Sequence, residues 1–579
     1  MKISIRQARN EKIKLQQLSI KSPANPDIKK WDGSEFQFIA QGRKDLPAQP
    51  MLLPLDWSQD PFSDRNWCGQ LQMWRPLDPF LAQFDRTKDG DWLKLPLKIA
   101  CDWHDYHKSG VKLSPLVWTD MHVGLRASKL AYLISQYQHG CLTVSDNDIL
   151  KLEAMAASHI DFLCDYQHIA MSNHTFFDMV GLGALAQVVD EKTGLACYKV
   201  LDDVVPKLAS TQFDRYGIHL ENSPAYHQFG IDCLKMLDRT GWFPNSGVHA
   251  LLVEAEKMLH WFILPDGRIL PFGDSNNYPQ NIKAIKTNSL TFNEVLNKSG
   301  YVILRNCRDG EVSTSSYFAV MGALNSKFHK QSDDLTFLWF EGEDIICDVG
   351  KYAYKSDIFR SYALSTRAHN TVEIDNENYY KGRISDDLLY GSAIRNTICH
   401  PWGYIIEAEV YHKKFEVLHQ RFFIYQPGQT LIVLDNLIST VSHEYTQWFH
   451  FASHLELQKN EHGYSAKTTS DRPLTVKHCS SKPTKDLLVI GQEKPVVQGW
   501  ISEEYAKVRP NYALGFNCNT DSVILGVQID LGTSDSSIVR ISPDSLDINI
   551  VDRGYDFALH LERTQYGGKL QFVEADADE

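Results

Sequence analysis

Three short segments of this chain bring together side chains that can move a proton or stabilise negative charge. Residues 172–175 read Ser-Asn-His-Thr, residues 220–227 contain an adjacent Tyr226 and His227, and residues 327–336 contain His329. Imidazole and phenol groups suit general acid and base chemistry, and amide or imidazole N–H groups can stabilise a developing anion. Each segment alone also fits a plainer interpretation, namely a helix N-cap, a turn before a helix and an exposed charged loop.

A fourth segment gathers cationic and hydroxyl side chains. Residues 360–372 contain Arg360, Arg367 and His369, and Arg126 lies in the first half of the chain. A guanidinium group binds carboxylate or sulfate through two parallel hydrogen bonds, so these arginines are candidates for gripping an anionic ligand. For any single arginine, pairing with one of the many acidic residues of the chain is the simpler alternative.

Helices must position the first two segments. Within residues 145–163, five apolar residues recur at helical spacing, and Ser145 with Asp148 forms a capping-box pattern at the start. Residues 120–137, 177–189 and 248–262 show similar periodicity. This succession predicts a layered or toroidal all-α domain from about Trp57 to Lys286.

The second half of the chain changes to strand patterns. Residues 523–531 alternate between apolar and polar side chains, which is typical of a strand with one buried face. Residues 422–425 and 431–434 flank Gln-Pro-Gly-Gln, which predicts a hairpin. We therefore expect an antiparallel β domain after a join near residues 288–300, with a large site in the cleft between two packed domains.

Composition narrows the class of protein and the kind of partner. The chain has 579 residues, 43% hydrophobic and 23% charged, with a formal net charge of −13. This charge argues against nucleic acid or an anionic membrane as a partner, and an anionic glycan would need a local basic groove. Residues 1–19 lack the apolar run of a secretory signal, and eleven cysteines contain no CxxC pair, so we expect reduced thiols and a cytoplasmic protein, or a periplasmic or secreted one if a leader was removed.

In order and spacing, these segments together resemble the heparinase II/III-type polysaccharide lyases, a group that includes heparinase III and related alginate and glycosaminoglycan lyases. Residues 64–67, 118–126 and 271–275 extend the resemblance over most of the chain. It implies an N-terminal extension over residues 1–50, an (α/α) toroid over 51–295, and an antiparallel β-sandwich over 296–579 that contributes to the active-site cleft.

The resemblance implies an enzyme that cleaves uronic-acid-containing glycans, such as heparan sulfate, heparin, hyaluronan or chondroitin, by β-elimination. It places Asn173 and His174 on the uronate carboxylate. Tyr226 is implied as the acid, and in a syn elimination also as the base, whereas His329 is the base for the opposite C5 epimer. A free tyrosine has a pKa of roughly 10, so a tyrosine base near neutral pH needs nearby positive charge or strong hydrogen bonding.

We expect the substrate to be contacted by aromatic, cationic and polar side chains of the matching segments. The candidates are Trp118, Arg126, Glu221, Asn222, His227, Tyr354, Arg360 and Arg367.

The resemblance further implies one structural divalent metal ion in the β domain, held by histidine, aspartate and histidine, and no organic cofactor. The matching positions here are Gln331, Asp348 and His369. An amide oxygen in place of an imidazole nitrogen weakens the case for zinc and favours a harder ion such as calcium or manganese.

Two other functions fit the same residues. A glycoside hydrolase could use Glu221 and Asp274 as acid and base. A noncatalytic glycan-binding protein of polysaccharide metabolism needs neither. Only a lyase leaves an ultraviolet-absorbing double bond on its product.

Overall fold

A computed structural model of the chain describes residues 3–573 except 9, 19–27, 44, 110–112, 120, 278, 280–290, 307–310, 355, 381–383, 533–536, 542–544, 553–554 and 565–566. Asp120 and the first part of the predicted join therefore lie outside the described residues. The chain forms two compact units, one made of Met1–Phe213 and Gly230–Val253, the other of Asp214–Phe229 and Glu254–Glu579.

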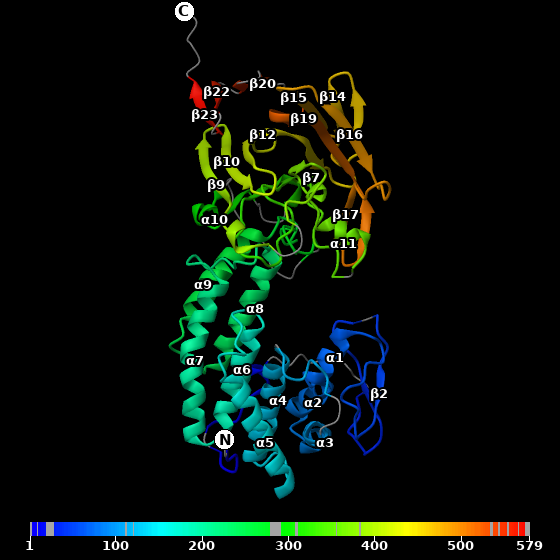
Figure 1. The fold of residues 1–579 in the computed structure, drawn as a ribbon, viewed down its shortest axis with the longest axis vertical. Coiled ribbons are helices and arrows are strands. Elements are labelled where there is room, and N and C mark those ends of the chain that lie inside the picture. The colour runs from blue at the N-terminus through cyan, green and yellow to red at the C-terminus, as the bar shows by residue number, and fades with distance from the viewer. Residues whose placement is uncertain are drawn as a thin grey trace, which may run out of the picture. The chain divides into compact units, whose positions relative to one another are not determined.

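The first unit is helical, and its helices run from blue to cyan-green in Figure 1. They are α1 (Arg65–Gln72), α2 (Asp78–Thr87), α3 (Lys94–Lys108), α4 (Met121–Gln138), α5 (Asp146–Leu163), α6 (Thr175–Val188) and α7 (Glu191–Gln212), beside a small pair of strands, β1 (Phe36–Phe38) and β2 (Gln49–Met51). Three of the four helices predicted from periodicity correspond to α4, α5 and α6, and the fourth, residues 248–262, corresponds to α9 (Val248–Leu259) with a 3-10 turn after it, so these predictions are confirmed.

Helix α5 shows why the periodicity was informative. Ser145 caps it, because its hydroxyl oxygen accepts the N–H of Asp148 at 3.2 Å. The hydroxyl also donates to the Asp148 carboxylate at 2.8 Å. The five apolar residues of the predicted face are all buried. Capping and burial together fix where the helix begins and which side faces the core.

Helices α4 and α6 approach so closely that only glycine fits between them. A Cβ on Gly124 would lie 2.4 Å from the Cα of Asp178, and one on Gly181 would lie 2.4 Å from the carbonyl oxygen of Gly124. The N–H of Gly124 also donates to the Asp178 carboxylate at 3.0 Å. Helix α6 begins directly after Asn173 and His174, so this contact holds the segment that carries both candidate residues.

Gly124→Ala is expected to lower the free energy of unfolding by about 1–3 kcal/mol, because the added methyl group forces two packed backbones apart. Thermal denaturation of the whole protein measures this. Ala154→Ser, on an exposed position of α5, is the matched control and should leave the transition unchanged. An unchanged transition in Gly124→Ala would contradict the close contact.

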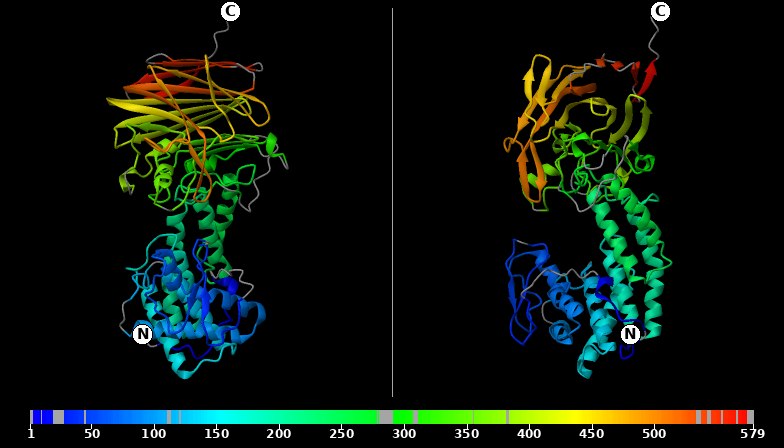
Figure 2. Two further views of the ribbon diagram at one scale, coloured as in Figure 1. Left: turned by 90° about the vertical axis from the view of Figure 1, so that its right-hand side faces the viewer. Right: turned by 180° about the vertical axis from the view of Figure 1, so that it is seen from behind.

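The second unit contains two large antiparallel sheets. One is β3-β4-β5-β6-β7 and the other has the order β13-β14-β15-β19-β12-β11-β10-β9, with β16 on β19 and β8 on β12. Figure 2, left, shows the long strands of the second sheet side by side. The bounds for the first sheet are β3 (Thr291–Phe292), β4 (Tyr301–Asn306), β5 (Ser316–Met321), β6 (Phe337–Glu341) and β7 (Asp344–Ile346). Those for the second are β8 (Val372–Ile374), β9 (Ser392–His400), β10 (Gly403–His412), β11 (Val417–Gln426), β12 (Thr430–His450), β13 (Gln458–Asn460), β14 (Gly463–Lys467), β15 (Pro473–Ser480), β16 (Lys485–Ile490) and β19 (Tyr512–Leu531).

The remaining elements of this unit are small or peripheral. They are α10 (Glu294–Lys298), α11 (Ile358–Ala363), the hairpin β17 (Trp500–Glu504) with β18 (Lys507–Pro510), and a sheet of β20 (Ser537–Ile541), β21 (Ser545–Asp552), β22 (Tyr555–Thr564) and β23 (Gly567–Val573).

The core of the second unit lies between the two large sheets. Phe318 on β5 stacks on Tyr425 of β11 with 4.7 Å between ring centroids, and Phe337 on β6 meets Phe449 of β12. One cluster of buried apolar residues contains side chains from both sheets. The predicted hairpin joins β11 to β12, with Gln426 opposite Thr430. The expected toroid followed by an antiparallel β-sandwich is confirmed.

Two helices pass from one unit to the other along the sequence. Helix α8 (Pro224–Thr240) begins in the second unit and ends in the first, and α9 (Val248–Leu259) does the reverse. The start of α8, with Tyr226, thus belongs to the same unit as the β-sandwich.

Two further observations concern the described part of the chain. Its ten cysteines are all free thiols. None of its helices combines the length and the apolar character that crossing a bilayer requires.

Candidate active site

Tyr226 lies in the first turn of α8, where serine side chains fix the backbone. The hydroxyl of Ser223 accepts the N–H of Tyr226 at 3.4 Å, and the hydroxyl of Ser275 accepts the N–H of Ala225 at 3.0 Å. The two hydroxyls are 2.8 Å apart. Pro224, the first helical residue, has no N–H to satisfy. The helix start is therefore well capped, and the tyrosine is presented from a fixed position.

His329 lies in the loop after β5, with its backbone in the left-handed region at a φ of +56°. The carbonyl oxygen of His329 accepts the N–H of Asp274 at 3.0 Å. Gly273 also has a φ of +56°, and a Cβ there would lie 2.7 Å from this carbonyl oxygen and 2.5 Å from that of Asn222. Residues 271–275 therefore need glycine at this position to hold the histidine loop.

Asn222 braces the same loop. Its side-chain amide donates to the carbonyl oxygen of Ser326 at 2.8 Å, and its side-chain oxygen accepts the N–H of Asn325 at 2.8 Å. The residue is buried and has a φ of +53°. Its amide group thus positions the loop that carries His329, which differs from the direct substrate contact that the sequence suggested.

The structure brings Tyr226 and His329 together. Their rings stack with 3.4 Å between centroids and 14° between planes. Nδ1 of His329 lies 3.2 Å from an Asp274 carboxylate oxygen, and Nε2 lies 3.7 Å from a carboxylate oxygen of Glu221. Because the Asp274 carboxylate accepts hydrogen bonds, it favours the tautomer with the proton on Nδ1. Nε2 is then free to accept a proton.

Asp274 is the centre of a hydrogen-bonded cluster. The Arg360 guanidinium lies 2.9 Å from one carboxylate oxygen, and the Gln331 amide donates to the same oxygen at 3.0 Å. Burial alone would raise the pKa of Asp274, but hydrogen bonding with His329 and the charge of Arg360 outweigh it, so this pKa lies below its usual value. Asp274 is therefore a carboxylate that orients His329.

The hydroxyl of Tyr226 lies 2.6 Å from the hydroxyl of Tyr354. Burial raises the pKa of Tyr226 to about 12, and the Asp274 and Glu221 carboxylates act in the same direction, whereas Tyr354 and Arg360 oppose them only in part. A tyrosine base would require nearby positive charge that lowers its pKa, and the charge of Arg360 is too small an effect to do so here. Tyr226 is thus a protonated acid at neutral pH.

Two other predicted substrate contacts in this unit have partners within the protein. His227 is buried, with Nε2 3.0 Å from the carbonyl oxygen of Ala255 and Nδ1 accepting the N–H of His219 at 3.2 Å. Arg367 forms an ion pair with Glu373 at 2.7 Å. The contacts of His227 therefore fix the start of α8 against residues 219 and 255. The ion pair of Arg367 fixes the loop in which this arginine lies.

The remaining predicted residues lie in the first unit. Arg126 is fully buried, and it donates to the carbonyl oxygens of Gln72 and Val117, both at 2.8 Å, and to a ring nitrogen of His159. Its guanidinium lies over the rings of Trp103 and Trp118. Arg126 therefore ties helices together, and Trp118 covers it. Asn173, which is buried, and His174, the N-cap residue of α6, lie at the start of that helix.

The three residues of the expected metal site are brought together in part. Nδ1 of His369 lies 3.0 Å from an Asp348 carboxylate oxygen, and Nε2 lies 3.1 Å from the carbonyl oxygen of Ala363. A carbonyl oxygen accepts only, so Nε2 carries a proton, and Nδ1 faces the Asp348 carboxylate as two ligands of one ion would. The Gln331 amide nitrogen is bound to Asp274, which leaves its buried side-chain oxygen without a partner among the described residues. Within that same part of the chain, no three histidine, cysteine or acidic side chains converge as a metal site.

If these residues hold the expected structural ion, removing it should lower the thermal transition, because an ion bound only by the folded chain stabilises that state. The measurement is turnover and thermal denaturation before and after dialysis against a chelator. A lowered transition that calcium, manganese or zinc restores would establish the site, whereas an unchanged transition and unchanged turnover would exclude it.

Known proteins resemble this chain in both sequence and fold. Residues 293–527 match the family described as heparinase II/III-like, C-terminal. This part of the chain, which holds most of the β-sandwich, is therefore similar to that C-terminal domain. A heparin-sulfate lyase from Bacteroides stercoris is 22% identical over 532 residues, which cover 81% of this chain and 75% of the relative.

Solved structures extend the similarity over the whole fold. The heparan sulfate lyase HepC from Pedobacter heparinus superposes with a TM-score of 0.63 at 16% identity, covering 93% of this chain and 87% of that one. A heparinase III structure gives a TM-score of 0.64 at 15% identity, covering 88% of this chain and 85% of that one. The resemblance to heparinase II/III-type proteins is thereby confirmed.

Sequence reasoning missed two residues of this site. Ser275 was seen only as part of a matching segment, although its hydroxyl helps to cap α8. Lys351 was not singled out, yet its ammonium group lies over the ring of Tyr354, 3.9 Å from the centroid. Neither has a sequence signal of its own, since a lone serine or lysine in a loop is usually solvated.

Proposed function

We propose that this protein is a polysaccharide lyase that cleaves uronic-acid-containing glycosaminoglycans by β-elimination. The observation that carries the proposal is the stack of Tyr226 on His329, in which an acid and a base lie side by side. The C5 proton and the C4 oxygen are bonded to adjacent atoms of the sugar ring, so a lyase needs two such groups within a few ångströms of each other. The names of the relatives support heparan sulfate or heparin as the first substrates to test.

His329 acts as the base in this proposal. Its Nε2 takes the C5 proton, and the electron pair of the broken C–H bond forms the C4–C5 double bond. Asp274 holds the proton on Nδ1, and it stabilises the imidazolium that forms, while Glu221 faces Nε2. This is the role that an orienting carboxylate plays toward a catalytic histidine in general.

Tyr226 acts as the acid. As the C4–O bond breaks, the phenol donates its proton to the departing oxygen, which leaves as the hydroxyl of the new reducing end. The pKa of about 12 keeps the phenol protonated before the reaction. The hydroxyl of Tyr354, 2.6 Å away, can stabilise the phenolate that results. The other product carries the unsaturated uronate.

Asn173 and His174 complete the proposal as donors to the uronate carboxylate, where negative charge accumulates in the transition state. Their assignment is supported by the matching Asn-His segment at the start of α6. Substituting Asn173 by alanine tests this, because a lost donor lowers kcat more than it raises KM.

The geometry is less suited to a glycoside hydrolase. A hydrolase base must contact the attacking water, whereas both carboxylate oxygens of Asp274 already accept hydrogen bonds, one from Gln331 and the other from His329, with Arg360 beside them. Incubation with heparan sulfate, heparin, hyaluronan, chondroitin, dermatan and alginate separates the two reactions. A lyase produces ultraviolet absorbance with each cut. New reducing ends without absorbance would establish hydrolysis and end the proposal.

A further inference from the structure

Lys351 is a partly buried cation that lies over Tyr354, whose hydroxyl contacts that of Tyr226. Its ammonium group lies 3.9 Å from the ring centroid of Tyr354 and 6.0 Å from that of Tyr505. Among the described residues this ammonium group forms no ion pair or hydrogen bond, and the Asp274 carboxylate, which acts on it from farther away, is itself paired with Arg360. Burial lowers its pKa, which shows that the charge has lost part of its hydration. A charge in that state is stabilised when an anion approaches.

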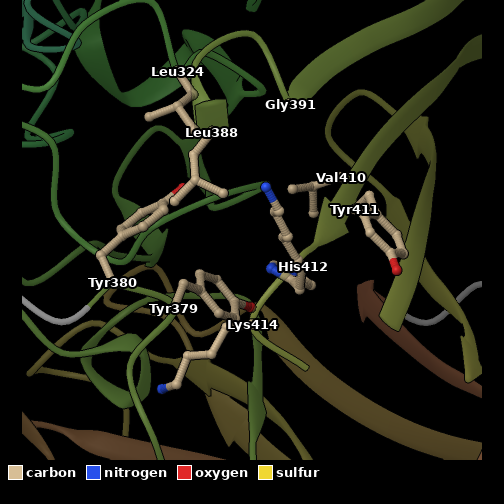
Figure 3. A pocket seen from close by; sticks show the side chains of 10 residues that line it. Leu324, Tyr379, Tyr380, Leu388, Gly391, Val410, Tyr411, His412 and Lys414 are labelled. Atoms are coloured by element: carbon tan, nitrogen blue, oxygen red, sulfur yellow. The ribbon is translucent and has the colours of Figure 1, made fainter. Parts of the chain in front are cut away.

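Other cations nearby in the same unit differ in this respect. Arg360 is paired with Asp274, and buried Lys330 is paired with Asp333 and Asp334. A separate hollow, shown in Figure 3, is lined by Leu324, Leu388, Val410 and Tyr411 together with two lysines. Those lysines, Lys413 and Lys414, form ion pairs with Asp387 and Glu377. Their charges are already compensated.

The backbone holds Lys351 in a fixed place. Its N–H donates to the carbonyl oxygen of Ser275 at 2.9 Å, and its carbonyl oxygen accepts from Arg360 at 2.8 Å. The β17–β18 hairpin attaches alongside, because the N–H of Ala506 donates to the carbonyl oxygen of Tyr352 at 3.0 Å. Ser275 and Arg360 also position Tyr226 and Asp274, so the lysine is tied to the catalytic groups.

Two tyrosines complete a surface around the ammonium group. Tyr354 is 51% exposed and Tyr505 is 56% exposed, so each offers a ring to solvent. We call Lys351, Tyr354 and Tyr505 the Lys351 patch. Its connection to the reacting groups is direct, since the hydroxyl of Tyr354 lies 2.6 Å from that of Tyr226. Exposed aromatic rings around a cation can receive the apolar face of a sugar and its charged substituent together.

We infer that the Lys351 patch is a saccharide subsite that binds an anionic group of the glycan outside the uronate that loses its proton, either a sulfate of the adjacent amino sugar or the carboxylate of the next uronate. This inference rests on the proposed function, and it names a residue that sets which glycans are accepted. The ammonium pairs with the anion while the tyrosine rings support the sugar. The subsite also supplies local positive charge on a chain whose net charge is −13.

Lys351→Gln is expected to raise KM about tenfold with little change in kcat, because one charge-assisted interaction is lost in both the bound substrate and the transition state. Two substrates distinguish the source of the anion. An equal rise on unsulfated heparosan and on heparan sulfate assigns the patch to a carboxylate. A rise on heparan sulfate alone assigns it to a sulfate.

Matched variants distinguish the loss of the Lys351 charge from a general loss of fold. Lys507→Gln removes a lysine from the same hairpin, but Lys507 is exposed and paired with Glu504, so KM should not change. Lys351→Arg keeps the charge and should restore most of the affinity. Tyr505→Ala should bind more weakly because it removes the ring, whereas Tyr505→Phe keeps the ring, loses only the 3.5 Å hydrogen bond from the N–H of Tyr354, and should bind nearly as the wild type does.

Binding is measured separately from turnover. Titration calorimetry with a heparan sulfate hexasaccharide compares Tyr226→Phe with Tyr226→Phe/Lys351→Gln, and we expect Kd to rise about tenfold in the double variant. If the wild type yields no unsaturated product from any glycan, the proposed function fails, and the calorimetry still tests the patch. Unchanged KM and Kd on replacing Lys351 would overturn the inference itself.

Discussion

Tyr226→Phe is expected to reduce kcat about 10²–10⁴-fold, while the protein still folds and binds oligosaccharide, because the variant removes the transferable proton and keeps the ring. The ring matters to the site, since it stacks on His329 with 3.4 Å between centroids. Phenylalanine preserves that stack. In a noncatalytic glycan-binding protein the change would leave binding unaltered and there would be no kcat to lose. In a hydrolase based on Glu221 and Asp274 it would change kcat only slightly.

The measurement is the initial rate of ultraviolet absorbance on the best glycan, together with Kd from calorimetry. Tyr354→Phe is the matched control, because it removes the other hydroxyl of the 2.6 Å pair without removing the acid. Its kcat should fall less than about tenfold, the scale of one hydrogen bond. Undiminished kcat in Tyr226→Phe would refute the acid role.

The pH profile provides a second check on the same residue. The acid form of a phenol is lost as the pH rises through its pKa, which is about 12 for Tyr226. A free tyrosine would lose half of its protons near pH 10. The rate of the wild type should therefore not decline around pH 10 through this group, and a decline there that is absent in a Tyr226 variant would argue against the raised pKa.

His329→Asn is expected to reduce kcat by a similar factor, about 10²–10⁴. Asparagine is chosen because His329 has a φ of +56°, and asparagine tolerates the left-handed region better than other residues that lack a base. The loop contacts made by the His329 carbonyl oxygen and Asn222 use the backbone, so they remain. The variant thus removes the proton acceptor with the least disturbance of its support.

The outcome is measured on glycans of both C5 epimers, with thermal denaturation as the test of fold. Loss on every glycan that the wild type cuts is the expected result. Loss on one epimer alone would assign the base for the other epimer to Tyr226. Full activity on both, in a folded variant, would exclude His329 as a base.

Local patterns predicted much of the fold. Residues 145–163 have both a cap and a buried stripe, and both are local properties of the sequence, so α5 was predicted to within a residue. The alternation over residues 523–531 likewise predicted the end of β19. Tyr226 and His329 were identified as candidates through the resemblance to known motifs. Nothing in the roughly one hundred residues between them indicates that their rings touch.

Burial and pairing could not be predicted in this way. Arg126 and Arg360 are the same residue type, and both were candidates for binding an anion, yet one is fully buried among backbone carbonyls and the other holds Asp274. The direction of the Tyr226 pKa shift depends on how burial compares with charges that come from distant segments. Lys351 is notable because its ammonium group has no ion-pair partner among the described residues, which is a property of the folded chain.

The division of the chain at α8 bears on how this protein can be dissected or recombined. The family match begins at residue 293, whereas Tyr226 reaches the β-sandwich unit as part of a separate stretch, Asp214–Phe229. A fragment cut at the sequence boundary of the β domain would contain His329, the proposed base, and lack Tyr226, the proposed acid. Exchange of this domain alone between relatives would transfer His329 without Tyr226. The proposed activity therefore depends on Asp214–Phe229 as much as on the domain that matches the family.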